Sequence, residues 1–122
     1  MKFAHLADCH IGGWKEAKLK ELGLKSFELA IDSSIKERVG FILISGDLFD
    51  TALPSIDLVK DTARILYKAR ILDIPIYIIP GSHDFSPSGK TMLDVLENAG
   101  LVVNVCRGDV DEKNMLRLKF TQ

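Results

Sequence analysis

Three short clusters of acidic residues and histidines carry most of the chemistry in this sequence. They are Asp8-Cys9-His10, residues 46–50 with Asp47 and Asp50, and residues 81–84 with His83 and Asp84. Each cluster directly follows a hydrophobic run that is typical of a buried strand. Because helical stretches separate these runs, we expect parallel strands that deliver all three clusters to one edge of a sheet, where open α/β folds bind ligands. Carboxylates and imidazoles gathered there predict a site for divalent metal ions.

The first two clusters contain the candidate metal ligands. In an extended segment, side chains two residues apart point to the same side, so Asp8 and His10 can both face one metal while Cys9 turns away. A helix-capping Asp8 beside an unrelated surface histidine is an equal alternative. Asp47 follows Gly46, which permits a sharp turn and a close metal, and one carboxylate can bridge two cations. A loop aspartate in an Asx-turn is the competing interpretation of Asp47, and the neighbouring clusters favour the metal.

The third cluster offers a candidate acid. His83 follows a Pro-Gly bend and is expected to be exposed, where an imidazole can protonate a leaving oxygen or stabilise transition-state charge. Asp84 can orient the His83 ring. Asp50 either supports the site or caps a helix that begins near Pro54. His5 lies within a strand and is interpreted as a core or sheet-face histidine.

The hydrophobic periodicity predicts an α/β fold with the order β-α-β-α-β-α-β-β and a mostly parallel sheet. A helix with apolar residues at 24, 27, 31 and 35 is expected to end near Gly40, and Pro54 suits the first turn of the next helix. The other expected elements are strands at 3–7, 41–45, 74–80, 101–105 and 115–120, helices at 54–72 and 91–98, and a polar turn at 111–114.

Composition sets wide limits on function. The 122 residues suit one domain, and 47% hydrophobic with 27% charged residues is the composition of a globular chain. A net charge of −1 gives no broad basic surface for nucleic acid. The small basic run of Lys15, Lys18 and Lys20 beside Trp14 is interpreted as a solvated helix face, with a nucleic-acid contact as the alternative.

Neither secretion nor membrane insertion is indicated. The two cysteines, Cys9 and Cys106, lack metal-binding or redox spacing and suit a reducing compartment. We find neither a signal-peptide pattern nor an apolar run of the ~18 residues that a membrane span needs. The expectation is a soluble cytoplasmic chain without membrane partners.

Taken in order, residues 4–12, 46–50 and 81–84 resemble the first three signatures of calcineurin-like metallophosphoesterases. The Gly-Asp-Leu-Phe-Asp segment, with the first motif, resembles their DNA-repair exonuclease branch, which includes the bacterial SbcD nuclease and the archaeal and eukaryotic double-strand-break nuclease. The resemblance implies a two-manganese nuclease (exonuclease or endonuclease) acting on phosphodiester bonds at DNA ends. It also implies an ABC-type, coiled-coil ATPase as partner, a homodimer to which helices 54–72 and 91–98 contribute, and a cytoplasmic or, in a eukaryote, nuclear location.

The resemblance assigns roles by position. Asp8 and His10 would hold the first metal, Asp47 would bridge both metals, and His83 would be the transition-state acid. Asp50 and Asp84 would support these residues. Ser82 stands where the family usually has asparagine, so it would be a weak ligand for the second metal.

The family's later histidine signatures have no counterpart after His83. Residues 1–122 are therefore expected to be the N-terminal half of a longer metallophosphoesterase sandwich, weak or inactive alone. Half a sandwich would leave an apolar sheet face uncovered and prone to self-association. Two alternatives stay open: a phosphomonoesterase or protein phosphatase of the same fold, and a metal-free binding module, which Ser82 supports best.

Overall fold

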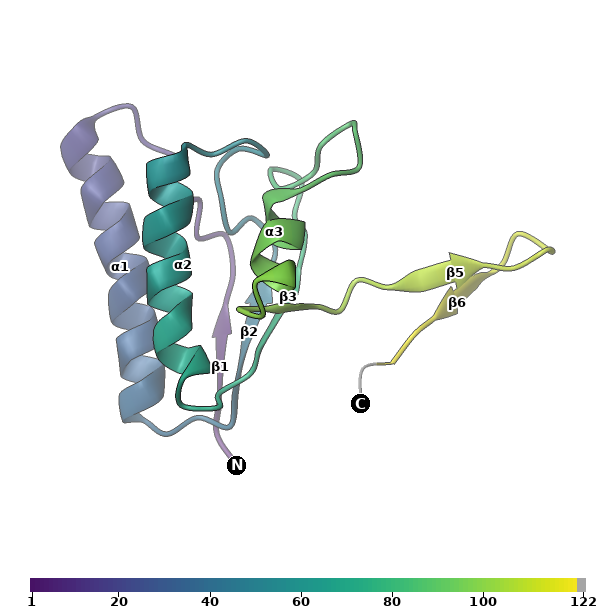
Figure 1. Cartoon of the computed structure of the whole chain (residues 1–122), viewed down its shortest axis with the longest axis horizontal. Coiled ribbons are helices and arrows are strands. Elements are labelled where there is room, and N and C mark those ends of the chain that lie inside the picture. Colours follow the sequence, from purple (N-terminus) through teal and green to yellow (C-terminus); the bar gives the residue numbers. More distant parts are fainter. Residues whose placement is uncertain (121–122) are drawn as a thin grey trace.

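Four parallel strands form the sheet that positions the three clusters (Figure 1). The structure is a computed structural model and describes residues 1–120. Strands and helices alternate along the chain, and the main sheet has the order β1-β2-β3-β4, so the expected α/β class is confirmed. The elements are β1 (Phe3–Leu6), α1 (Ala17–Lys36), β2 (Phe41–Ser45), α2 (Ile56–Arg70), β3 (Ile76–Ile79), α3 (Met92–Asn98), β4 (Val103–Asn104), β5 (Gly108–Val110) and β6 (Leu116–Leu118).

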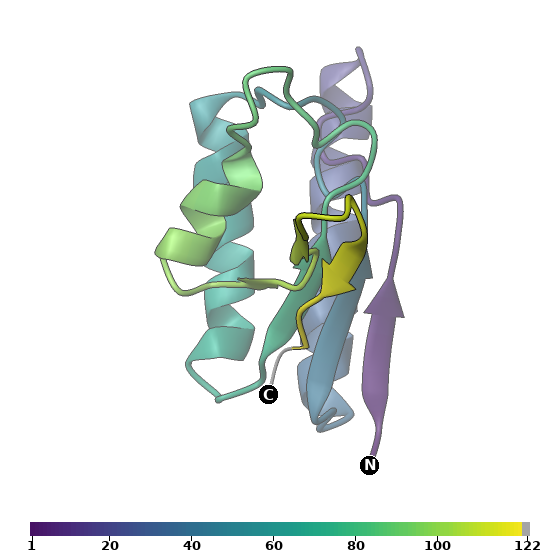
Figure 2. The same cartoon turned by 90° about the vertical axis from the view of Figure 1, so that its right-hand side faces the viewer.

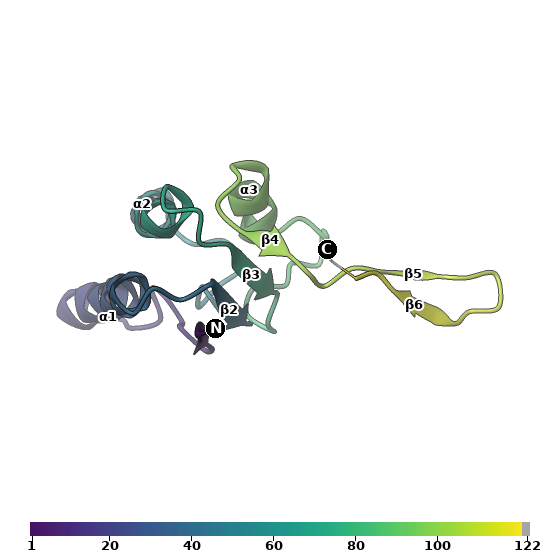
Figure 3. The same cartoon turned by 90° about the horizontal axis from the view of Figure 1, so that it is seen from below.

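The hydrophobic core lies between the sheet and the helices, which all cover the same face (Figure 3). Side chains alternate along a strand, so every second residue of β2 and β3 points to the helices. These inward strand residues are at most 2% exposed: Ile42, Ile44, Ile76 and Ile78. They pack with residues at helical spacing on α1, α2 and α3, namely Phe27, Ile31, Ile65, Leu66, Leu93 and Leu96.

The opposite face of the sheet has no covering layer among the described residues. The rings of Phe3 and Phe41 stack there with centroids 5.2 Å apart, and Tyr77 meets Phe41 edge-on. Phe3 is 55% exposed. The open apolar face expected from the sequence is therefore present, while self-association through it stays a prediction.

The C-terminal region contains a strand that the sequence analysis missed. Beyond β4 the chain forms a separate antiparallel hairpin, β5–β6, which projects from the body on the open side of the sheet (Figures 1 and 2). Gly108 and Asp109 are residue types that strands usually avoid, so β5 gave no signal. The Asp111 carboxylate accepts hydrogen bonds from the backbone N–H groups of Lys113 and Met115, and this turn brings the two strands together.

Local caps set the helix boundaries more sharply than the apolar pattern did. The α2 helix begins at Ile56 because Ser55 accepts a hydrogen bond from the Leu58 N–H, and the expected start at Pro54 is early. The α3 helix begins with a capping box formed by Thr91 and Asp94. Within the described residues, no helix combines the length and apolarity needed to cross a bilayer.

Candidate metal centre

The three clusters meet at the edge of the sheet where β1, β2 and β3 end (Figure 1). Hydrogen bonds between the first two loops continue the β1–β2 pairing beyond the strands. The backbone N–H of His10 donates to the Asp47 carbonyl over 2.9 Å, and the N–H of Ile11 donates to the Leu48 carbonyl over 2.9 Å. The first cluster is thus fixed against the second by the backbone itself.

The candidate ligands sit at bends with left-handed backbone. The φ angles are 52° at Asp8, 43° at His10 and 50° at Asp47, a region that residues other than glycine rarely occupy. The expectation of an extended segment at Asp8 and His10 is therefore wrong. Asp8 and His10 nevertheless share one side, and Cys9 turns to α1, where it lines a hollow with Phe27. Strained backbone of this kind concentrates at functional sites.

A glycine allows the second and third loops to approach each other. A Cβ atom at Gly81 would collide with the backbone nitrogen and the carboxylate of Asp47, so no other residue fits there without displacing Asp47. This close approach allows Asp47 Oδ1 to accept a hydrogen bond from the His83 backbone N–H over 2.9 Å. The Asp47 carboxylate therefore lies between the first and third clusters, with its Oδ2 facing His10.

His10 is held in the orientation of a metal ligand. Its Nδ1 lies 3.0 Å from Asp50 Oδ1, and a carboxylate accepts hydrogen bonds, so this contact suits the tautomer that carries its proton on Nδ1 and leaves the Nε2 lone pair for a metal. Nε2 lies 3.8 Å from Asp8 Oδ1 and 3.7 Å from Asp47 Oδ2, too far for hydrogen bonds.

These separations suit atoms that share one cation. Two atoms each ~2.1 Å from the same ion are roughly 3.0 Å apart at a right angle and 4.2 Å apart on opposite sides. The ligand atoms of Asp8, His10 and Asp47 all lie within 4.8 Å of one another. An imidazole and two carboxylates are donors that divalent ions accept. The residues at this edge therefore fit a divalent metal.

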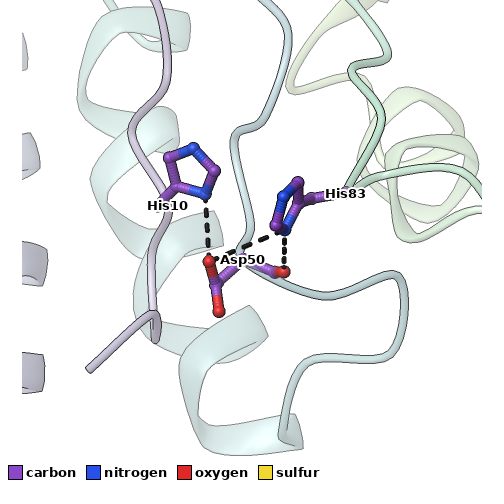
Figure 4. A group of neighbouring side chains, drawn as sticks. All are labelled: His10, Asp50 and His83. Atoms are coloured by element: carbon purple, nitrogen blue, oxygen red, sulfur yellow. Dashed lines mark hydrogen bonds and ion pairs between the residues drawn. The ribbon is translucent and has the colours of Figure 1, made fainter. Parts of the chain in front are cut away.

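Asp50 joins the two histidines of the site (Figure 4). Its carboxylate bonds to His10, and its backbone carbonyl accepts a hydrogen bond from His83 Nδ1 over 2.7 Å. The two imidazole rings meet edge to face with centroids 4.8 Å apart. The hydrogen bond to the Asp50 carbonyl raises the pKa of His83, and the nearby carboxylates of Asp47, Asp50 and Asp84 raise it further. Sequence reasoning gave Asp50 only a supporting part, because nothing in the motif shows that it contacts both rings.

Asp84 acts on the backbone of the neighbouring loops. It is 3% exposed, and its carboxylate accepts hydrogen bonds from the N–H groups of Gly81, Leu48 and Phe49 at 3.0, 3.3 and 3.2 Å. The expected contact between Asp84 and the His83 ring is not among the hydrogen bonds of residues 1–120. Asp84 therefore links the second loop to the third. This role could be recognised only in the three-dimensional structure.

The remaining candidates lie further from the centre. Ser82 is exposed next to His83, and its role as a metal ligand stays a prediction. His5 lies on the open face of the sheet, where its Nε2 is 2.7 Å from the Ser45 hydroxyl oxygen, in agreement with its interpretation as a sheet-face histidine.

Comparison with known proteins gives a consistent family. The family described as calcineurin-like phosphoesterase matches residues 1–118. The chain is 31% identical, over 98% of its length, to the DNA double-strand break repair protein Mre11 of Archaeoglobus fulgidus, covering 28% of that protein. It is 36% identical over 72% of its length to the Mre11 protein of Methanococcus maripaludis, covering 24% of it. A metallophosphoesterase of Bacillus subtilis, YhaO, is 32% identical over 80% of this chain and is covered to 26%. The chain thus spans about a quarter of the length of these relatives.

Proposed function

Since this chain belongs to the calcineurin-like phosphoesterase family, we propose that it is part of a metal-dependent DNA nuclease that acts in double-strand-break repair. In this proposal, residues 1–122 are the N-terminal part of the nuclease domain. The similarity to proteins named for double-strand-break repair supports the choice of DNA as substrate.

One observation carries the proposal: the geometry around His10. Its Nδ1 is bonded to Asp50, and its Nε2 faces the oxygens of Asp8 and Asp47 at 3.7–3.8 Å. A carboxylate that holds the far nitrogen of a metal-binding histidine fixes the ring and raises its basicity. Asp8, His10 and Asp47 would hold the first cation.

Asp47 is also the candidate bridging ligand. Its Oδ2 faces His10, while its Oδ1 lies against the backbone of His83, so the two oxygens address different sides of the site. Ser82 would contribute to a second cation on the His83 side. Oxygen-rich ligands with one imidazole favour manganese as the ion. A bound divalent pair would supply charge neutralisation on the phosphate and lower the pKa of an attacking water.

His83 would act as the acid that assists the leaving oxygen. Its Nδ1 proton is committed to the Asp50 carbonyl, so Nε2 is the nitrogen available to a substrate. The raised pKa favours the protonated ring that an acid requires. Because the side chain is 47% exposed, a phosphodiester can reach it from solvent. Asp50 keeps both this ring and His10 in place.

The proposal extends to the assembly. The double-strand-break nucleases that the motifs resemble work as homodimers with an ABC-type, coiled-coil ATPase, and we assign the same partners to this protein. Exposed apolar side chains on and next to α2 and α3, including Ile56 and Val95, are available for the dimer contact. A role in chromosome repair implies a location at the nucleoid, or in the nucleus of a eukaryote.

The test is a cleavage assay with the full-length gene product. Manganese-dependent release of nucleotides from labelled duplex DNA is expected, with little hydrolysis of para-nitrophenyl phosphate. Asp47→Asn should abolish cleavage together with manganese binding, whereas His83→Asn should lower the rate and leave binding intact. Asp73→Asn is the matched control, since Asp73 is 95% exposed in its side chain and lies beyond the far end of α2. Efficient hydrolysis of the phosphomonoester without cleavage of DNA would overturn the proposal.

A further inference from the structure

The only tryptophan of the sequence lies exposed beside the candidate metal centre. Trp14 is 58% exposed. Tryptophan is highly buried on average, so a largely exposed one in a short loop calls for an explanation. Here the loop leads directly from the first cluster into α1.

The backbone before Trp14 touches the site. The N–H of Gly13 donates to the His10 carbonyl over 2.9 Å. A Cβ atom on Gly13 would lie 3.1 Å from the Asp50 carboxylate oxygen that bonds to His10. The Cα of Trp14 is one peptide unit, ~3.8 Å, further along the chain. The indole is thus attached next to residues that orient both histidines.

This loop is held at its base. Ile11 is 1% exposed and forms a parallel bridge with Phe49. Gly12 lies so close to the Leu58 side chain of α2 that a Cβ atom there would be 2.6 Å from Leu58 Cδ1. An aromatic side chain on an anchored loop loses little conformational freedom when a flat ligand stacks on it.

Three exposed lysines, Lys15, Lys18 and Lys20, follow Trp14 within six residues, and Glu16 and Glu21 are the acidic residues of the same segment. None of these three lysines takes part in the ion pairs found within residues 1–120, whereas Lys2, Lys60, Lys68 and Lys119 all do. Unpaired lysines next to an exposed aromatic ring match the combination that binds single-stranded nucleic acid, in which bases stack and phosphates are neutralised.

We propose that Trp14 stacks on an unpaired base of a single-stranded DNA end while Lys15 and Lys18 contact its phosphates, directing the strand to the metal centre. This inference rests on the proposed nuclease function and specifies its substrate as an end with unpaired nucleotides. A base in a duplex is already stacked on its neighbours and gains less from the indole.

The test uses the 122-residue chain, in which all tryptophan fluorescence comes from Trp14. A short oligothymidylate, titrated at low salt with a chelator to prevent cleavage, should quench this fluorescence saturably, and a closed hairpin duplex of equal length should quench it less. Anisotropy of the labelled oligothymidylate should show that Trp14→Ala weakens binding by roughly 5- to 150-fold, the equivalent of one lost base stack. Trp14→Phe should retain most of the affinity.

Two matched controls separate stacking and charge from general surface effects. Tyr67→Ala removes an aromatic ring that is 56% exposed on the distal half of α2, and it should leave affinity unchanged. Lys18→Ala should weaken binding and reduce the salt dependence by ~0.7 in the log–log slope. Lys36→Ala, which removes the same charge at the other end of α1, roughly 27 Å away along the helix, should do neither.

The outcomes distinguish this inference from the proposed function. Manganese-dependent cleavage of DNA with equal affinity in Trp14→Ala and wild type would overturn the stacking inference and leave the nuclease standing. Saturable binding of the labelled oligothymidylate that Trp14→Ala weakens, in a protein whose full-length form cleaves no DNA, would support the stacking site and contradict the nuclease. Absence of both oligothymidylate binding and DNA cleavage would overturn both the stacking site and the nuclease.

Discussion

Asp84 is predicted to stabilise the fold by several kcal/mol, because its buried carboxylate is the acceptor for three backbone N–H groups. Replacement by alanine leaves the N–H groups of Leu48, Phe49 and Gly81 without this partner in a nearly water-free place. One hydrogen bond to a charged acceptor is worth ~1.5–3 kcal/mol. The three bonds share one carboxylate and the loops can relax, so their energies do not add fully. We expect Asp84→Ala to lower the free energy of unfolding by about 3–5 kcal/mol, as for other broken buried charge interactions.

Urea denaturation followed by circular dichroism measures this loss as a lower midpoint at unchanged slope. The stability of Asp84→Asn should fall between that of Asp84→Ala and that of wild type, because the amide keeps one acceptor oxygen but points its own N–H groups at the backbone donors. Asp8→Asn is the control: its side chain is 72% exposed, and its one ion-pair contact within residues 1–120 is the 3.8 Å separation from His10 Nε2, so the free energy of unfolding should change by less than ~0.5 kcal/mol. If Asp84→Ala lowers the free energy of unfolding by less than ~1 kcal/mol, the reasoning is refuted.

Three further predictions concern other parts of the molecule. Burial, with help from nearby carboxylates, raises the pKa of the Cys9 thiol from 9.0 to about 11, so at neutral pH a thiol reagent should label exposed Cys106 well before Cys9. The folded form keeps that proton longer than the unfolded form, and stability should therefore fall as pH rises from 9 towards 11. The hydrogen bond from Lys68 lowers the pKa of Glu28 below 4.5. Glu28→Gln should therefore reduce the free energy of unfolding by about 0.5–1 kcal/mol at neutral pH. The difference in stability between the variant and wild type should vanish in acid, where the wild-type carboxylate becomes protonated. Gly81→Ala should weaken manganese binding at least ~10-fold in a calorimetric titration, because the new methyl group displaces Asp47; unchanged affinity would show that the Asp47 position is dispensable.

The convergence of the clusters could be predicted from the sequence because it follows from topology alone. Apolar runs separated by helical stretches make parallel strands, and parallel strands end on the same edge. This logic brought Asp8, His10, Asp47 and His83 together without any knowledge of their side-chain orientations. The helical spacing of apolar residues likewise identified Phe27 and Ile31 of α1, which lie in the core.

The supporting contacts could not be predicted, since they depend on how loops distant in sequence approach each other. The left-handed backbone at Asp8 and His10 arises where the first loop pairs with the second. Asp50 likewise joins separate motifs, because it contacts the rings of both His10 and His83. Asp84 does the same by accepting hydrogen bonds from backbone N–H groups of the second loop. The β5 strand was missed because its residues have low strand propensity and pairing with β6 decides its conformation.

The most direct test of the central claim, that three strand ends form one metal site, is calorimetric titration of the protein with manganese. Wild type is expected to give saturable heat, and Asp47→Asn is expected to abolish it because Asp47 faces both His10 and the third loop. His83→Asn, which leaves the three proposed ligands in place, should still bind. Equal binding by wild type, Asp8→Asn and Asp47→Asn would contradict the account.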